Sequence, residues 1–436
     1  MRSRKFLLLC SLLAACGAAS RGQDASSLVG YVTRAVSGSD FDVNGHRILC
    51  DRKTHTTVES DRGAKVSVAG CPSELPFIGE FLIIIGPVYN GSNLIHASRI
   101  ESSRSPRHDI AGFAVIDAAA TRDATEAQAS DLIIRADGYR IRITGTTKIE
   151  WNPPLQSFDD LKAGSWVRYK GKLDATGVLI AASVQIGANE IDSREEKLRD
   201  KNEYDPSAIP ADARQNFLNV TFRGGYDPKK FPPFADAEMQ ARVEKIGSSL
   251  IPAYQRALPE SDPAKIHLRF QVIDNKHFCG LIPCDAIALP SGIILVPHQM
   301  VERMQNDSQL AAVLADSIAR ALEKQRYRTH DELVGAGATA LAGLFVPYAG
   351  GVMTSIGSAT ERKILTDAME QSGRVSLVLL HDAGYDIDQA PIAWWLLNAE
   401  KPQTLSEIEI PDRATYLYRI LGEVWNNPAA SASQAH

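Results

Sequence analysis

The chain has 436 residues, of which 44% are hydrophobic and 23% are charged, so it is long enough for two or three globular domains. Its formal net charge is -5 at pH 7. This balance argues against a nucleic-acid-binding protein, because such proteins carry an excess of positive charge on the surface that meets the phosphates.

Residues 1–23 have the pattern of an export signal. Basic residues precede an apolar run over residues 6–13, which is too short to span a membrane as a mature helix. The tetrapeptide Leu13-Ala14-Ala15-Cys16 resembles a bacterial lipobox. We therefore expect a lipid on Cys16 and a protein anchored to a membrane on the periplasmic side of the cell envelope. The alternative is an ordinary signal peptide cut near Ala19.

Four cysteines follow the signal, and they form two pairs that are close in sequence, Cys50 with Cys71 and Cys279 with Cys284. In an oxidising compartment such pairs indicate disulfides. The second pair could instead be half of a metal site with His277, but no second pair of ligands is nearby. The sequence therefore predicts two disulfides.

An internal repeat occupies residues 26–102 and 108–188. Each copy has an Asn-Gly or Asp-Gly step, two glycines at the same spacing that bracket a six-residue segment, and then a Leu-Ile-x-Ala-Ser strand. The matching elements are Asn44-Gly45 and Asp137-Gly138, Gly79/Gly86 and Gly164/Gly171, and residues 94–98 and 179–183. Asn-Gly and Asp-Gly between apolar strands predict hairpins. We therefore expect two small antiparallel β-barrels with OB-like proportions.

Four aromatic residues of the second copy are candidates for a ligand-binding face: Tyr139, Trp151, Trp166 and Tyr169. The same side chains can fill the barrel or cover its edge, and this is the interpretation that we favour. No carboxylate pair or histidine cluster recurs between the two copies, so we expect no catalysis in the barrels.

Residues 189–232 are charged at first and then rich in proline, which indicates a partly ordered linker. A further domain is expected at residues 233–430. Its predicted elements are a helix over 235–258, a strand over 267–273, a hairpin over 285–296 and a helix over 299–304. Either Asn306 or Asp307 can then cap the next helix.

That next helix, residues 309–320, reads QLAAVLADSIAR. It resembles the active-site helix of the HtpX/BepA/CAAX-prenyl-protease family of zinc metallopeptidases, in which LAAVLA precedes H-E-I-A-H. In that motif two histidines four positions apart bind zinc, and the glutamate between them is the general base. The corresponding residues here are Asp316, Ser317 and Arg320. A serine cannot take a proton from a metal-bound water, and an arginine cannot ligate a cation.

The resemblance extends to two further segments. Residues 285–296 are similar to the N-A-x-A-x-P-G-G-x-I hairpin of the same family, whose edge strand lies above the active-site cleft. The resemblance implies that a peptide adds to this strand, near Ile287, Leu289, Ile293 and Ile294. The turn Ala383-Gly384-Tyr385-Asp386 matches the turn that follows the family's third zinc ligand, a glutamate, and at the family spacing this position is Gln371.

All three expected ligands and the base are thus replaced, so we expect neither zinc nor another cofactor. Asp316 and Arg320 can form an ion pair along one helix face in the place of the metal, and Gln371 can hydrogen-bond to either. The alternative is that both side chains point to solvent in an open cleft. The histidines of this domain form no H-x3-H pair: His277, His298, His330 and His381.

These observations predict two OB-like barrels followed by an α+β domain of metallopeptidase-like, gluzincin type. The expected function is that of a lipid-anchored pseudopeptidase that binds peptide or unfolded protein in the cell envelope. One alternative is an active metalloendopeptidase with a non-standard site that uses Asp316, Glu323 or Asp367. Another is a structural envelope protein that binds through its barrels. Residues 333–358, uncharged and rich in glycine and alanine, predict packed helices, with a membrane-inserted hairpin as the alternative.

Overall fold

The computed structural model describes residues 26–59, 65–87, 93–102, 109–122, 131–201, 203–205, 207, 209, 231–262, 264–274, 285–325, 327–329, 332, 359–398 and 410–426. Several predictions fall outside these ranges: the export signal with Cys16, the pair Cys279/Cys284, His277, His330 and residues 333–358. No helix in the described part of the chain is both long enough and apolar enough to cross a membrane.

The second copy of the repeat is a closed five-stranded β-barrel, as predicted. Its strands are β9 (Asp109–Arg122), β10 (Leu132–Ala136), β11 (Tyr139–Ile143), β12 (Lys148–Trp151), β13 (Trp166–Leu173) and β14 (Leu179–Gly187). Around the ring the order is β9-β10-β11-β14-β13, and β13 pairs with β9 to close it. Strand β12 adds to β14 outside the ring.

The expectation of a wholly antiparallel barrel is wrong at one pair of the ring. Strands β11 and β14 run parallel, and so do β12 and β14. The reason is geometric, because an odd number of strands cannot alternate in direction all the way around a closed ring. The alternating apolar pattern reports which face of a strand is buried and does not encode its direction.

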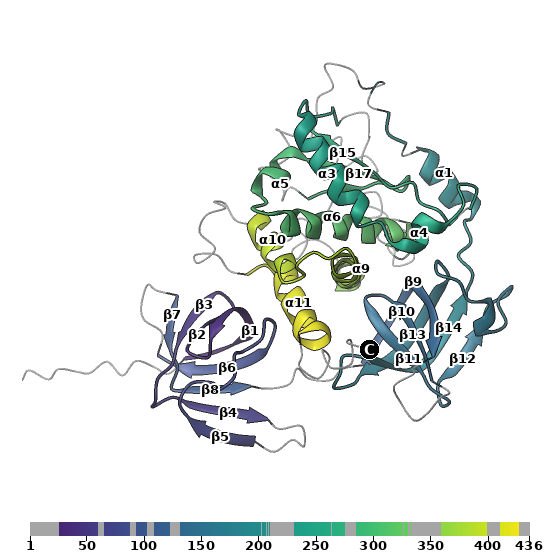
Figure 1. The fold of residues 1–436 in the computed structure, drawn as a ribbon. Coiled ribbons are helices and arrows are strands. Elements are labelled where there is room, and N and C mark those ends of the chain that lie inside the picture. The colour runs from purple at the N-terminus through teal and green to yellow at the C-terminus, as the bar shows by residue number, and fades with distance from the viewer. Residues whose placement is uncertain are drawn as a thin grey trace, which may run out of the picture.

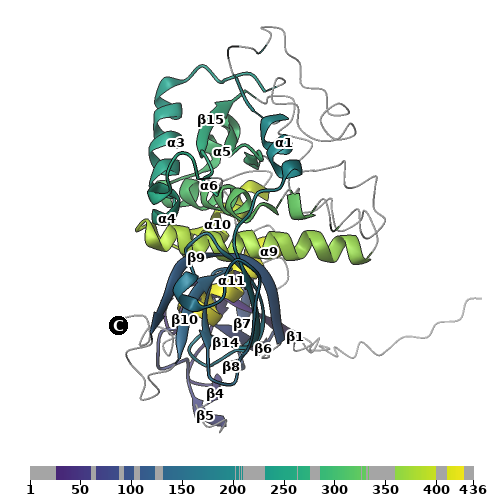
Figure 2. The same cartoon turned by 90° about the vertical axis from the view of Figure 1, so that its right-hand side faces the viewer.

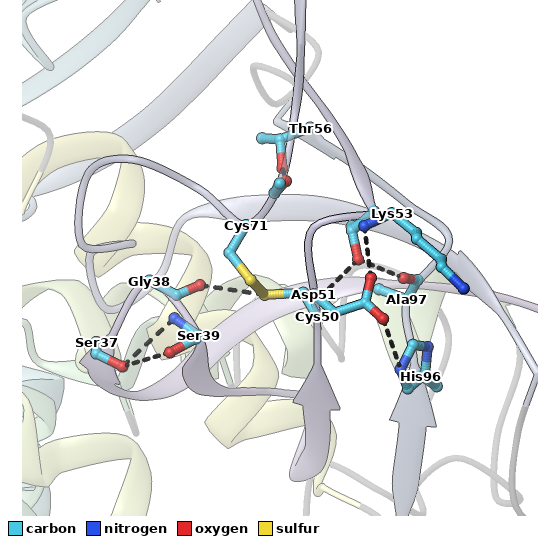
Figure 3. Close-up of a disulfide and its surroundings, with 12 residues drawn as sticks. Ser37, Gly38, Ser39, Cys50, Asp51, Lys53, Thr56, Cys71, His96 and Ala97 are labelled. Atoms are coloured by element: carbon cyan, nitrogen blue, oxygen red, sulfur yellow. Dashed lines mark hydrogen bonds and ion pairs between the residues drawn. A yellow bond between two sulfur atoms is a disulfide. The ribbon is translucent and has the colours of Figure 1, made fainter.

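The first copy repeats this strand order. Its strands are β1 (Ser26–Ser37), β2 (Asp40–Val43), β3 (His46–Leu49), β4 (His55–Glu59), β5 (Lys65–Ala69), β6 (Phe81–Gly86), β7 (Leu94–His96) and β8 (Arg99–Ser102). The last strand is split, so that β7 pairs in parallel with β3 while β8 pairs with β6 and β4. The predicted disulfide between Cys50 and Cys71 is confirmed, and it ties the segment after β3 to the segment after β5 (Figure 3).

The two repeated turns have the conformation that their residues favour. Asn44 and Gly45 have φ values of 46° and 74°, and Asp137 and Gly138 have values of 55° and 74°. Two consecutive positive φ angles define a type I′ turn, which joins twisted antiparallel strands with little strain. Both turns also face the helices: a Cβ on Gly45 would lie 2.7 Å from the Trp395 ring, and one on Gly138 would lie 2.6 Å from the Cβ of Arg374.

The C-terminal domain packs helices against a three-stranded sheet of order β15-β17-β16. Its elements are α3 (Ala237–Ser249), α4 (Ala253–Ala257), β15 (Arg269–Ile273), β16 (Ile287–Ala288), β17 (Ile293–Pro297), α5 (His298–Arg303), α6 (Asp307–Leu322), α9 (Ala359–Asp382), α10 (Gln389–Asn398), α11 (Asp412–Ile420) and the π-helical turn η6 (Leu421–Trp425). Helix α6 lies at the centre, in contact with α3, α9, α10 and both hairpin strands.

Both barrels pack against the helices, and α11 lies between them in Figure 1. Figure 2 shows α9 running across the end of the second barrel. The second barrel shares one continuous apolar core with the helices, whereas the first barrel has a core of its own. The second barrel is therefore the one that can form a buried site together with the C-terminal domain.

Candidate functional site

Helix α6 carries the candidate motif into the interior. Its first turn is capped by Asn306, whose side chain accepts a hydrogen bond of 2.9 Å from the backbone N–H of Gln309. The apolar run that follows is fully buried, so the helix presents Asp316 and Ser317 with no exposed surface. Arg320, one turn later, is 6% exposed.

The ion pair predicted along this helix is present. Nη2 of Arg320 lies 2.7 Å from Oδ2 of Asp316. The alternative, in which both side chains point to solvent, is contradicted by their burial. The pair does not stand alone, however, because Arg413 from α11 donates a hydrogen bond to the other oxygen of Asp316.

A second carboxylate completes the group. Oδ2 of Asp285, just before β16, accepts a hydrogen bond of 3.0 Å from Nη2 of Arg320 and lies 3.6 Å from Nη1 of Arg413. Asp285, Asp316, Arg320 and Arg413 form what we call the buried charge cluster. It contains two acids and two bases, so its formal charges balance when all four groups are ionised.

Neighbouring groups hold the cluster in place. The guanidinium of Arg413 stacks over the Trp394 ring at 3.4 Å from its centre. The Ser372 side chain lies beside Asp316 and favours its ionised form, while its hydroxyl donates a hydrogen bond of 3.0 Å to the Met369 carbonyl. Burial opposes ionisation of Asp316, but Arg320 and Arg413 outweigh it and lower the pKa of that carboxyl, whereas burial raises the pKa of Asp285.

The expected hydrogen bond from Gln371 to Asp316 or Arg320 is wrong, and the neighbouring Ser372 is the α9 residue beside Asp316. The Gln371 side chain points to the second barrel, where Nε2 donates a hydrogen bond of 2.7 Å to the Phe113 carbonyl. Its Oε1 accepts from Nε2 of Gln325 at 3.3 Å. Adjacent residues on a helix face directions about 100° apart, so only one of them can meet the cluster.

These residues do not fit a zinc ion. Zinc takes nitrogen, sulfur or carboxylate ligands, and both oxygens of Asp316 already meet guanidinium groups. No group of three or more His, Cys, Asp or Glu in the described residues could hold a metal. His298 stacks on Phe234 with ring centres 4.1 Å apart, and His381 is exposed at the end of α9.

The four hairpin residues assigned to peptide binding are buried: Ile287, Leu289, Ile293 and Ile294. Ile287, Leu289 and Ile293 pack in a small core with Tyr204 and Phe231 from the segment predicted as a linker. Their side chains are occupied inside the protein. A peptide at this hairpin would therefore pair with the backbone of β16, and strand addition there stays a prediction.

A second charged region lies where the second barrel meets α9 and α11. We call it the seam cavity, and its volume is about 650 Å³. At its base Arg374 holds both carboxylate oxygens of Asp137 at 2.8 Å. Asp137 also accepts hydrogen bonds from the Tyr169 hydroxyl, and Arg374 donates to the Tyr416 hydroxyl. This network joins the repeated Asp-Gly turn to the helices.

Two of the four aromatic candidates in this barrel, Tyr139 and Tyr169, are buried and line the seam cavity. Trp151 and Trp166 are partly exposed. The aromatic residues therefore divide between the end of the barrel at the seam and its outer surface. The pattern of residue types identified them, but only the docking of the helices placed two of them in a cavity.

Glu323 and Arg328 follow α6 beside this cavity. The Glu323 carboxylate accepts a hydrogen bond of 3.0 Å from the Val115 N–H of β9 and lies 3.9 Å from Nη1 of Arg328. Burial raises the pKa of Glu323 to about 8, an effect that Asp137 strengthens and Arg328 opposes. At neutral pH most of this carboxyl is therefore protonated.

Sequence reasoning missed Asp285, Arg413, Ser372 and Arg328 as parts of these two regions. Asp285 opens the hairpin that resembles the family's hairpin, and Arg413 is the second residue of α11. Arg419, also on α11, stacks over the Tyr416 ring at 4.8 Å and lies outside the buried charge cluster.

Comparison with known families adds one finding. Residues 124–185 match a family described as "Domain of unknown function (DUF5666)". The match spans strands β10 to β13 and most of β14 of the second barrel, and it leaves the helices uncovered. A search of curated proteins found no match to the chain.

Proposed function

We propose that this protein is an exported, lipid-anchored homologue of zinc metallopeptidases that has lost catalysis and binds peptide or protein segments in the bacterial cell envelope. The buried charge cluster is the observation that carries the proposal. Two of its members, Asp316 and Arg320, stand on the helix that resembles the zinc-binding helix of the HtpX/BepA/CAAX-prenyl-protease family, at the two positions where histidine ligands would be.

The chemistry of the cluster supports the loss of catalysis. A zinc peptidase needs an open coordination position for water and a base beside it. Here two guanidinium groups contact Asp316, and Ser317 donates a hydrogen bond of 3.4 Å to the Ala286 carbonyl. The site is filled by its own side chains, so neither water nor a peptide carbonyl has a place beside a metal.

The remaining architecture supports a binding role. The order of helix, strand, hairpin, helix and motif helix agrees with the family's order, and the closed ring of the second barrel has the five strands of an OB fold. Barrels of that type bind extended ligands on an open face or in their loops. The seam cavity places such a barrel beside a helix of the C-terminal domain.

The test is metal content and peptidase activity of the mature chain, purified with zinc supplied. We expect far less than one zinc ion per chain and no cleavage of an unfolded protein substrate, while the same substrate is retained in a binding assay. Asp316→Ala is the matched variant. Close to one zinc per chain in the parent protein, lost in that variant, would overturn the proposal in favour of an active enzyme with a non-standard site.

A further inference from the structure

We propose that the seam cavity binds the C-terminal carboxylate of a peptide or unfolded protein segment, held by Arg168 and Arg328 beside the ring of Phe113. This inference rests on the proposed function, because it assumes that the protein binds peptide segments. It goes further in naming the site, the end of the peptide that enters it and the residues that recognise it.

The first support is the pairing of charges around the cavity. Three lining cations have a carboxylate partner in the same wall: Arg374 with Asp137, Lys363 with Asp367 and Arg419 with Glu370. Arg168 and Lys170 on β13 have no carboxylate within ion-pair distance among the described residues. For Arg328, the nearest carboxylate among the described residues is that of Glu323, whose Oε2 lies 3.9 Å from Nη1 of the arginine.

The second support is that two guanidinium groups lie near one ring. Arg168 and Phe113 are directly opposite each other on β13 and β9. The guanidinium carbon of Arg168 lies 5.7 Å from the centre of the Phe113 ring, and that of Arg328 lies 4.3 Å from it. Two like charges near one ring repel each other, and an anion between them would relieve that repulsion. Guanidinium groups suit a carboxylate because they can donate two parallel hydrogen bonds to it.

The electrostatics around Arg328 agree with this geometry. Burial lowers the pKa of Arg328, and Arg168 adds to that effect through its like charge. The carboxylates of Glu323, Glu332 and Asp137 oppose this effect, but they do not outweigh it, so the pKa of Arg328 stays below its usual value. A bound carboxylate would therefore supply the counter-charge that the protein itself provides only in part.

The walls of the cavity favour a peptide end over a polyanion. The lining also contains four carboxylates, three of them paired with a lysine or arginine, and they limit the net positive charge that a ligand with several negative charges would meet: Asp109, Glu332, Asp367 and Glu370. Ile110, Ile364 and Ala368 supply an apolar surface for a side chain. A volume of about 650 Å³ lies within the range of pockets that enclose small ligands, roughly 300–1,000 Å³.

The experiment compares two pools of randomised short peptides with a fluorescent label at the N-terminus, one with a free C-terminal carboxylate and one with a C-terminal amide. Fluorescence anisotropy is measured on the whole mature protein. We expect the amide pool to bind roughly tenfold or more weakly, because the loss of a charge-assisted hydrogen bond costs at least that factor. Inorganic phosphate is tested as a competitor and should displace the free-acid pool poorly.

Two variants locate the site. Arg168→Gln is at an exposed position, so it should fold like the parent and weaken binding of the free-acid pool about tenfold. Arg328→Gln should do the same and should abolish the difference between the pools. Lys172→Gln, on the same strand and paired with Asp109, is the control and should bind like the parent.

The outcomes separate this inference from the proposed function. Equal binding of the two pools, or unchanged binding in Arg168→Gln, would overturn the carboxylate site and leave peptide binding intact. Strong competition by phosphate would replace the carboxylate with a phosphate-bearing ligand and overturn it equally. Absence of binding by either pool would overturn both this inference and the binding role.

Discussion

The buried charge cluster and the seam cavity are both rich in charged side chains, but they differ in how many of those charges have a partner of opposite sign. In the cluster, Asp316 meets two guanidinium groups and has no exposed surface. In the seam cavity, Arg168 is exposed, and Arg328 approaches its nearest carboxylate only at 3.9 Å. In the buried charge cluster the charged groups contact one another, whereas in the seam cavity cations line a space of about 650 Å³.

This difference indicates which of the two regions can bind a ligand. A balanced set of buried charges acts as structure, because removing any member leaves its partners unpaired in a low-dielectric interior. An unbalanced set that lines a cavity has capacity left for a ligand. We therefore propose that the buried charge cluster has a structural role and that the seam cavity is the candidate for binding.

The largest effect is expected from Asp316→Ala. The substitution leaves Arg320 and Arg413 buried without their main counter-charge, so the free energy of unfolding should fall by about 3–5 kcal/mol. Urea denaturation measures it. Asp307→Ala is the control, because Asp307 stands on the same helix and pairs with Arg242 at 2.7 Å on the surface, where a loss of about 1 kcal/mol or less is expected. Equal losses in the two variants would mean that the cluster does not stabilise the fold through its burial.

The next effect concerns Glu323 and depends on pH. Its pKa is raised from 4.5 to about 8 in the folded chain, so between these values the folded protein keeps a proton that the unfolded chain has released. The free energy of unfolding must then decrease as the pH rises through this window. Glu323→Gln cannot ionise and keeps an oxygen to accept from the Val115 N–H.

We therefore expect Glu323→Gln to stabilise the protein on the order of 5 kcal/mol above about pH 8, and to have little effect below about pH 4.5. Urea denaturation across this range measures the difference between the variant and the parent. A difference that stays constant with pH would show that Glu323 ionises normally, and the imbalance of charge around Arg328 would then be smaller than argued above.

The smallest effect on stability is expected from Arg168→Gln. This side chain is exposed and has no carboxylate partner among the described residues, so the free energy of unfolding should change by no more than about 0.5 kcal/mol. Thermal unfolding of the variant beside the parent measures this. A large loss of stability would place Arg168 with the structural charges and remove the contrast between the two regions.

Local patterns in the sequence determined much of the fold. The Asn-Gly and Asp-Gly steps specify turns with positive φ, the apolar run before Asp316 specifies a buried helix, and Cys50 and Cys71 are near enough in sequence to pair. Each of these rests on residues that are neighbours along the chain, where backbone preferences and side-chain periodicity act directly. The i,i+4 pair of Asp316 and Arg320 could be predicted for the same reason.

Only the tertiary structure decided which distant groups complete each region. Arg413 is 97 positions from Asp316, and Asp285 is 35 positions from Arg320. Gln371 bonds to Phe113 across 258 positions, which turned it away from the cluster and left that place to Ser372. Such contacts depend on how the second barrel docks against α9, and docking is set by the packing of whole surfaces. No periodicity within one segment carries that information, so the seam cavity could not be foreseen from the sequence.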